Sequence, residues 1–101
     1  MTDPLGLEIK NAVASVLQTK PSVHKAVVFG SRAKGTHTPR SDVDIALYGD
    51  VDFLEVENIM CDLEELPFTQ KFDVVAYNLV ANTSLREHIS RVGVVVYEQI
   101  K

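Results

Sequence analysis

Apolar residues recur along this chain at two spacings, and the change from one spacing to the other divides it into alternating helices and strands. Spacings of three and four residues predict helices over about 4–18, 53–66 and 84–92. Continuous or alternating apolar residues predict strands over 26–29, 42–47, 72–77 and 94–97. A short helical turn is expected over 31–34, between the first two strands.

Capping residues mark where these helices begin and end. The three starts are marked by Asp3 before Pro4, by Asp52 with Glu55 and by Ser84 with Glu87. Pro67 and Gly93 end the second and last of the long helices. The second long helix is expected to bury a stripe of six apolar side chains, namely Phe53, Val56, Ile59, Met60, Leu63 and Leu66.

The elements follow in the order helix, strand, short helix, strand, helix, strand, helix, strand. This order is typical of an α/β layer protein. We expect an α/β fold with α+β character, in which helices pack on a small mixed sheet of about four strands. No internal repeat, low-complexity tract or linker divides the chain, so the sequence predicts a single domain over residues 1–101.

Composition narrows the class of protein. Of the 101 residues, 46% are hydrophobic, which is typical of a folded globular domain. No apolar run is long enough to cross a membrane, and the start lacks the pattern of a signal peptide. The single cysteine, Cys61, excludes an internal disulfide. We therefore expect a soluble cytoplasmic protein with no membrane partner.

The charge pattern argues against a general nucleic-acid binder, because the net charge is −4 and such proteins carry an excess of Lys and Arg. The charges are unevenly distributed. From Asp50 to Glu65 there are seven acidic residues and no Lys or Arg. This acidic run is either the solvated face of a helix or a surface for a basic partner.

The candidate chemistry gathers in residues 27–47, which read VVFGSRAKGTHTPRSDVDIAL. Asp42 and Asp44 stand two residues apart at the head of a strand, so their carboxylates project from one face with Cα atoms roughly 6.6 Å apart. Mg²⁺ prefers a few carboxylates plus phosphate oxygens and water, so two acids and a nucleoside triphosphate form a plausible site. Asp73 is a third candidate carboxylate, because an acid within an apolar strand is disfavoured outside a site or an edge.

The turn before these acids suits a phosphate group. Gly30 lets the backbone approach closely, Ser31 supplies a hydroxyl, and the helical turn that follows presents free N–H groups. Arg32 and Lys34 would neutralise a triphosphate, with Arg40 as a third cation.

Two other motifs in the chain have simpler explanations. Gly30 and Gly35 fit the glycine spacing of a P-loop, but the Lys-Ser/Thr that must follow is replaced by Thr36 and His37. Asp50-Val51-Asp52 is a second D-x-D, but its position at a turn and a helix start explains both acids as cap and dipole partners. The three histidines have no paired spacing, and surface or cap roles are expected for them.

The residues Gly30-Ser31, ten further residues, and then Asp42-x-Asp44 form a G-S-x10-D-x-D string. This string is the motif of the polymerase β-type nucleotidyltransferase superfamily. Together with the short chain and the later FDVV strand, it resembles the minimal nucleotidyltransferases (MNT type), commonly the antitoxin partners of all-helical HEPN toxins. One departure is Lys34, where the family usually has Arg, and a lysine loses the planar bidentate fork.

The resemblance implies a function, cofactors and a site. The metal aspartates of the family fall on Asp42 and Asp44, its third carboxylate on Asp73, and its nucleotide-binding turn on Gly30 and Ser31, with Arg32 and Gly35 alongside. Two Mg²⁺ ions are implied, with ATP as the nucleoside triphosphate. The expected reaction moves AMP, or another nucleotide monophosphate, onto a hydroxyl, most plausibly a tyrosine of a HEPN toxin.

Two other functions stay open at the level of sequence. The protein neutralises its toxin by binding alone, with no turnover, or it modifies a small molecule as an aminoglycoside nucleotidyltransferase does. The small-molecule alternative implies a homo-oligomer with the acceptor pocket between subunits, whereas the antitoxin alternatives imply a hetero-oligomer with the toxin. The chain lacks the extra substrate domain of the larger relatives, which argues against a freestanding role on small molecules.

Overall fold

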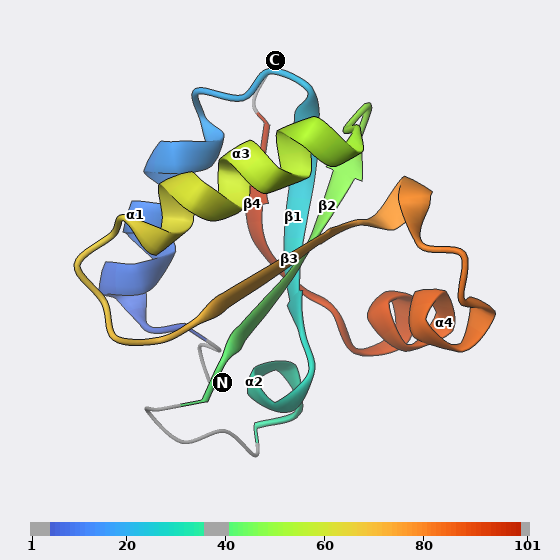
Figure 1. Cartoon of the computed structure of the whole chain (residues 1–101). Coiled ribbons are helices and arrows are strands. Elements are labelled where there is room, and N and C mark those ends of the chain that lie inside the picture. The colour runs from blue at the N-terminus through green and yellow to red at the C-terminus, as the bar shows by residue number, and fades with distance from the viewer. Residues whose placement is uncertain (1–4, 36–40, 100–101) are drawn as a thin grey trace.

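One sheet of four strands organises the molecule, and its strand order is β3-β2-β1-β4 (Figure 1). The strands are β1 (Val23–Phe29), β2 (Val43–Gly49), β3 (Phe72–Ala76) and β4 (Val94–Glu98). β1 runs antiparallel to both β2 and β4, whereas β2 and β3 run parallel. The computed structural model describes residues 5–35 and 41–99. The mixed sheet of four strands confirms the predicted fold class.

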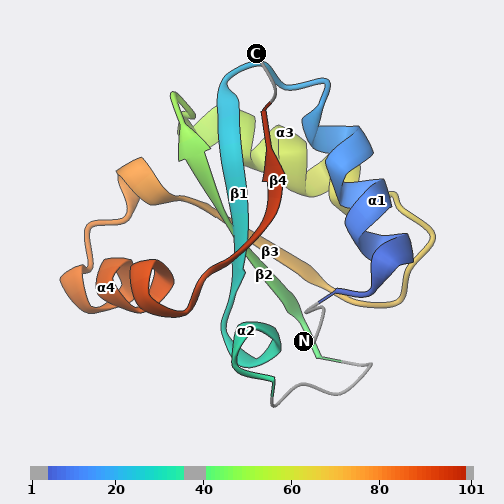
Figure 2. The ribbon, with the colours of Figure 1, turned by 180° about the vertical axis from the view of Figure 1, so that it is seen from behind.

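The helices lie between the strands in the predicted order. They are α1 (Leu7–Leu17), α2 (Ser31–Lys34), α3 (Phe53–Glu64) and α4 (Thr83–Val92), with a 3-10 turn η1 (Tyr77–Leu79) between β3 and α4. α1 and α3 pack on one face of the sheet and α4 lies on the other, as Figures 1 and 2 show from opposite sides. None of the described helices is long and apolar enough to cross a membrane.

The two sheet faces differ because strand residues alternate in direction. In β3, Phe72, Val74 and Ala76 are buried against α1 and α3, whereas Asp73 and Val75 point to the face that carries α4. The main core lies under α1 and α3 and includes Leu17, Ile59 and Leu63, which are fully buried. The α4 face has a smaller core around Val27, Ala46 and Ile89. Asp73 therefore lies on the α4 face and not in the main core.

Two predicted helix starts are wrong. α4 begins at Thr83 because the Asn82 side chain accepts a hydrogen bond from the Leu85 N–H at 3.0 Å, so Asn82 is its N-cap in place of Ser84. α1 begins at Leu7 with Gly6 as its N-cap, and Asp3 and Pro4 lie outside the described residues. The third predicted cap is confirmed, because Asp52 accepts from the Glu55 N–H at 2.8 Å.

Phe53 and Tyr77 also depart from the prediction. Phe53 was expected in a buried stripe but is 71% exposed, because it is the first residue of α3 and little of the described chain covers it. α3 itself ends at Glu64, before Leu66. Tyr77 was expected in the third strand but begins η1, where its ring stacks on that of Tyr48 at 4.5 Å between centroids. The strand therefore stops at Ala76.

Candidate active site

The parallel pairing of β2 with β3 brings two of the predicted carboxylates together. Asp44 is the register partner of Asp73, so the two residues lie side by side on neighbouring strands. Both project onto the α4 face of the sheet, because paired residues of adjacent strands share a face. Asp42 precedes β2 by one residue and is exposed. Residues 29 positions apart in the sequence thus meet at one end of the sheet.

The turn that follows β1, at Gly30, lies at the same end of the sheet as Asp44 and Asp73. Phe29, the last residue of β1, pairs with Asp44, and Gly30 follows it with a φ of +77°. A Cβ built on Gly30 would overlap the Asp44 carboxylate. Gly30 is therefore required both by its left-handed backbone and by the acid that lies against it.

Arg32 ties the turn to the segment that carries the aspartates. Its side chain is 4% exposed, and its Nε and Nη2 donate to the Ser41 carbonyl oxygen at 3.3 Å and 3.1 Å. Burial lowers the pKa of the Arg32 guanidinium from its usual value. Since Ser41 directly precedes Asp42, this contact positions Asp42 relative to α2. The predicted contact of Arg32 with a nucleotide stays a prediction.

Among the three carboxylates of Asp42, Asp44 and Asp73, that of Asp44 has a shifted pKa. Burial raises the pKa of the Asp44 carboxyl from its usual value, and the nearby charges of Asp73 and Asp42 raise it further. Three carboxylates that repel one another in this way are stabilised by a bound cation. Their oxygen donors match the preference of Mg²⁺, which takes a few carboxylates and completes its shell with phosphate oxygens and water.

The described residues do not form a closed metal cage. No group of three His, Cys, Asp or Glu side chains within 5–35 and 41–99 is arranged to hold a metal ion. A site built from Asp42, Asp44 and Asp73 would therefore need ligands from the nucleotide, which agrees with the way Mg²⁺ binds in phosphate-transfer sites. The residues fit such an ion in donor type and in charge.

The other predicted nucleotide-binding residues lie on the turn itself. Ser31 begins α2, Lys34 ends it with an exposed side chain, and Gly35 follows with a φ of +76°. The Lys34 N–H donates to the Gly30 carbonyl oxygen at 3.2 Å, which closes the turn. Arg40, a further predicted cation, lies outside the described residues.

One neighbour of the site is not apparent in the sequence. His88 of α4 packs edge-on against the Phe29 ring, with 6.3 Å between ring centroids. It therefore lies beside the residue that joins β1 to Gly30. The sequence treats His88 as a surface residue, since no spacing links residue 88 to residue 29, and only the packing of α4 on the sheet brings them together.

Comparisons with known proteins identify the family and the fold of this chain. The family model for Polymerase beta, Nucleotidyltransferase matches residues 11–101. A Methanocaldococcus jannaschii protein with the provisional name protein adenylyltransferase is 44% identical over 46 residues. That match covers 46% of this chain and 44% of the relative, so the chain aligns with less than half of its length.

Two solved structures share the fold. A chain of a toxin–antitoxin complex with AMP-PNP superposes with a TM-score of 0.74 and 22% identity, over 89% of this chain and 73% of that one. A chain from a complex of a tri-AMPylated Shewanella oneidensis HEPN toxin with its MNT antitoxin gives a TM-score of 0.70 and 19% identity, over 91% and 71% of the two chains. Because the family model covers nearly the whole chain, this protein belongs to the polymerase beta nucleotidyltransferase family.

Proposed function

We propose that this chain is a Mg²⁺-dependent nucleotidyltransferase that moves AMP from ATP onto a protein hydroxyl, with a tyrosine of a HEPN-type toxin as the acceptor. One observation carries the proposal. Asp44 and Asp73 pair across parallel strands, and the Gly30 turn of the family motif lies against the Asp44 carboxylate. This proximity supports a site in which the carboxylates would hold metal ions and the turn would hold phosphate groups.

Each residue has a role in this proposal. Asp42, Asp44 and Asp73 would hold two Mg²⁺ ions, which supply charge neutralisation of the triphosphate when bound. Gly30, Ser31 and the adjacent Lys34 bind the β- and γ-phosphates through backbone N–H groups, a hydroxyl and an ammonium group. Arg32 acts through Ser41 to position Asp42.

The reaction is a substitution at the α-phosphorus of ATP. The acceptor hydroxyl oxygen forms a bond to that phosphorus, the bond to the bridging oxygen of the β-phosphate breaks, and pyrophosphate leaves. Asp73 lies beside Asp44 and accepts the proton of the acceptor hydroxyl. The acceptor hydroxyl approaches on the α4 face of the sheet, on which Asp73 lies.

Three findings on other proteins support a protein acceptor and a toxin partner. The curated relative is named a protein adenylyltransferase, a fold neighbour was solved with AMP-PNP, and another was solved with a tri-AMPylated HEPN toxin. Transfer to such a toxin would make this chain its antitoxin and assemble the two as a hetero-oligomer.

The test is label transfer from α-³²P-ATP to the cognate HEPN protein in the presence of Mg²⁺. Asp42→Asn with Asp44→Asn should reduce transfer by more than about 100-fold, because both metal carboxylates are lost. The second D-x-D of the chain provides the matched control. Asp50→Asn with Asp52→Asn removes the same charge, and asparagine still caps α3, so transfer should persist.

Two outcomes would overturn the proposal. Undiminished transfer by the Asp42 and Asp44 variant would show that these acids are not the metal ligands. Loss of transfer by this variant, together with full protection of cells from the toxin, would show that the antitoxin acts by binding alone.

A further inference from the structure

The outer edge of β3 is open. β3 is the last strand of the sheet, and within the described part of the chain no strand pairs with its outer side. The Val43 N–H donates to the Lys71 carbonyl oxygen at 2.8 Å, so the backbone of residue 71 points towards β2. Backbone N–H and C=O groups alternate in direction along a strand. Those of Phe72, Val74 and Ala76 therefore point away from β2, to the outer side of β3. Such an edge is a template for pairing.

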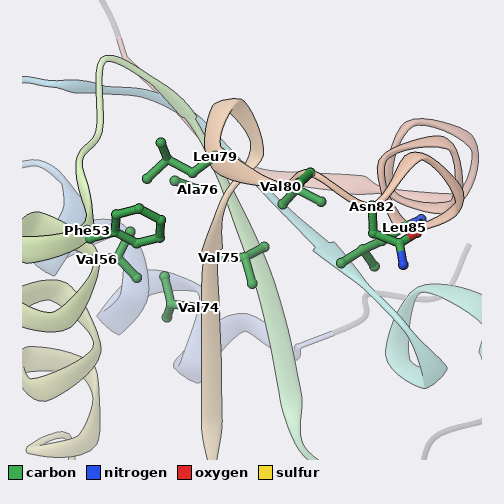
Figure 3. A pocket seen from close by; sticks show the side chains of 10 residues that line it. Phe53, Val56, Val74, Val75, Ala76, Leu79, Val80, Asn82 and Leu85 are labelled. Carbon is green, nitrogen blue, oxygen red and sulfur yellow. Dashed lines mark hydrogen bonds between the residues drawn. The ribbon is translucent and has the colours of Figure 1, made fainter.

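An apolar groove of about 360 Å³ follows this edge (Figure 3). We name it the β3-edge groove, and it is lined by Phe53, Val56, Val74, Val75, Ala76, Leu79, Val80, Ala81, Asn82 and Leu85. Side chains from α3 lie on one side of the strand and side chains from α4 on the other (Figure 3). Phe53, which is 71% exposed, stands at its α3 wall.

The groove leads directly to the candidate active site. Val75 lines the groove, and Asp73 precedes it by two residues on the same face of the same strand. Residues two apart on a strand have Cα atoms roughly 6.6 Å apart. A chain lying along β3 therefore passes beside the third carboxylate.

The charge of α3 indicates which charge a segment bound in the β3-edge groove would carry. Glu57 and Glu64 follow Phe53 at helical spacings of four and eleven residues, so they stand on the same stripe as Phe53 and are exposed. Over 50–65 the chain has seven acidic residues and no basic one. The α3 wall thus favours a segment that carries Lys or Arg.

We infer that an extended, basic segment of the acceptor polypeptide, outside its helices, adds a fifth strand to the outer edge of β3. An extended segment uses the open backbone groups of β3, and its alternating side chains enter the apolar pockets on both sides of the strand. A side chain opposite Asp73 on an added strand lies about 4.5–5.5 Å away at Cβ, on the face that carries Asp44. The inference rests on the proposed function and names how its acceptor is held.

The test is binding, measured without ATP or Mg²⁺ so that its outcome does not depend on transfer. The probe is a short synthetic peptide of alternating lysine and valine with one central tyrosine, titrated into ¹⁵N-labelled full-length protein. Amide shifts should concentrate on Phe72–Ala76, Val80 and Leu85. The control is the same peptide with alternate backbone nitrogens methylated, which keeps its charges and side chains. It loses the N–H groups on the edge that would pair with β3, so its binding should weaken by about tenfold or more.

Two exposed residues of the first turn of α3 provide a matched pair of variants. Phe53 and Leu54 are 71% and 67% exposed, but only Phe53 lines the groove. Phe53→Ala should weaken peptide binding by about tenfold, whereas Leu54→Ala should leave it unchanged. Both variants should keep the Tm of the parent, since each side chain is largely solvated.

Three results would overturn the inference. These are binding of the methylated peptide as tight as that of its parent, amide shifts that lie away from β3, and a dimer in sedimentation that Phe53→Ala alone dissolves. The last result would assign the edge to a second copy of this chain. Label transfer that proceeds normally alongside any of these would leave the proposed function intact.

Discussion

Gly30 and Asp44 lie against each other at the end of β1, and each constrains the other. Gly30 holds a φ of +77°, and the Asp44 carboxylate occupies the space where a Cβ would stand. The G-S-x10-D-x-D string predicts both residues, but it does not predict that they touch. Their contact depends on the antiparallel register that pairs Phe29 with Asp44.

Gly30→Ala should therefore lower stability by more than its backbone conformation alone explains. A left-handed alanine costs about 1–2 kcal/mol, and displacement of the Asp44 carboxylate adds about 1–3 kcal/mol. Gly6→Ala is the control, since Gly6 has a φ of +79° and no described atom lies within 4 Å of a Cβ built there. Urea unfolding measures both, and equal losses of free energy would contradict the close contact with Asp44.

Asp44→Asn should raise the Tm of the free protein at neutral pH while it abolishes transfer. The pKa of Asp44 is raised by burial, then by Asp73 and Asp42, so the folded state holds this proton more tightly than the unfolded state. Stability therefore falls as pH rises above about 4, the ordinary pKa of aspartate, and stops falling once the pH has passed the raised pKa of Asp44. The advantage of asparagine should disappear below about pH 4, where the carboxyl is protonated in both states.

Thermal unfolding across pH measures this effect. Asp50→Asn removes a charge from an exposed position outside the cluster and should leave Tm nearly unchanged. A decrease in Tm for Asp44→Asn at neutral pH would contradict the repulsion among the three carboxylates.

At the scale of elements, α2 links the Gly30 turn to β2. Its four residues place Arg32 inside the protein, where it donates twice to the Ser41 carbonyl oxygen. The sequence predicts this short helix and its cations, but it treats Arg32 and Lys34 alike. Burial separates them, since Arg32 is 4% exposed and Lys34 is exposed. Which cation of such a turn is buried depends on packing that the motif does not encode.

Arg32→Ala and Lys34→Ala should consequently affect different quantities. Loss of charged hydrogen bonds from a buried group should make Arg32→Ala less stable by about 1.5–3 kcal/mol. Lys34→Ala should change stability by less than about 0.5 kcal/mol but should weaken ATP binding. Chemical denaturation and calorimetric titration of a non-hydrolysable ATP analogue separate the two effects. Equal stability of the two variants would contradict the positioning role of Arg32.

The start of α4 offers a test of the corrected cap. Asn82→Ala should lower stability by about 1 kcal/mol, because the Leu85 N–H loses its acceptor. Ser84→Ala, at the position that the sequence favours as the cap, should change it by less than about 0.5 kcal/mol. The prediction failed here because two capping residues stand two positions apart. Arg86, which donates to the Tyr77 and Val80 carbonyl oxygens, holds the chain that enters at Asn82.

At the scale of the whole molecule, the site exists because β3 returns beside β2. α3 connects these parallel strands, and such crossovers place the second strand next to the first. The apolar patterning predicted the order of elements and the four-strand sheet, since each strand is a short run of continuous or alternating apolar residues. It could not predict the strand order or the exposed Phe53, because these depend on which neighbours cover each edge.

Carboxylates from two strands that are distant in sequence and adjacent in the sheet act as one site, and Asp73→Asn tests this most directly. The measurement is the intact mass of the cognate HEPN protein after incubation with ATP, Mg²⁺ and each variant. We predict that the parent and Asp50→Asn add whole AMP units, whereas Asp73→Asn adds none within the same time. AMP addition by Asp73→Asn at the rate of the parent would contradict the claim.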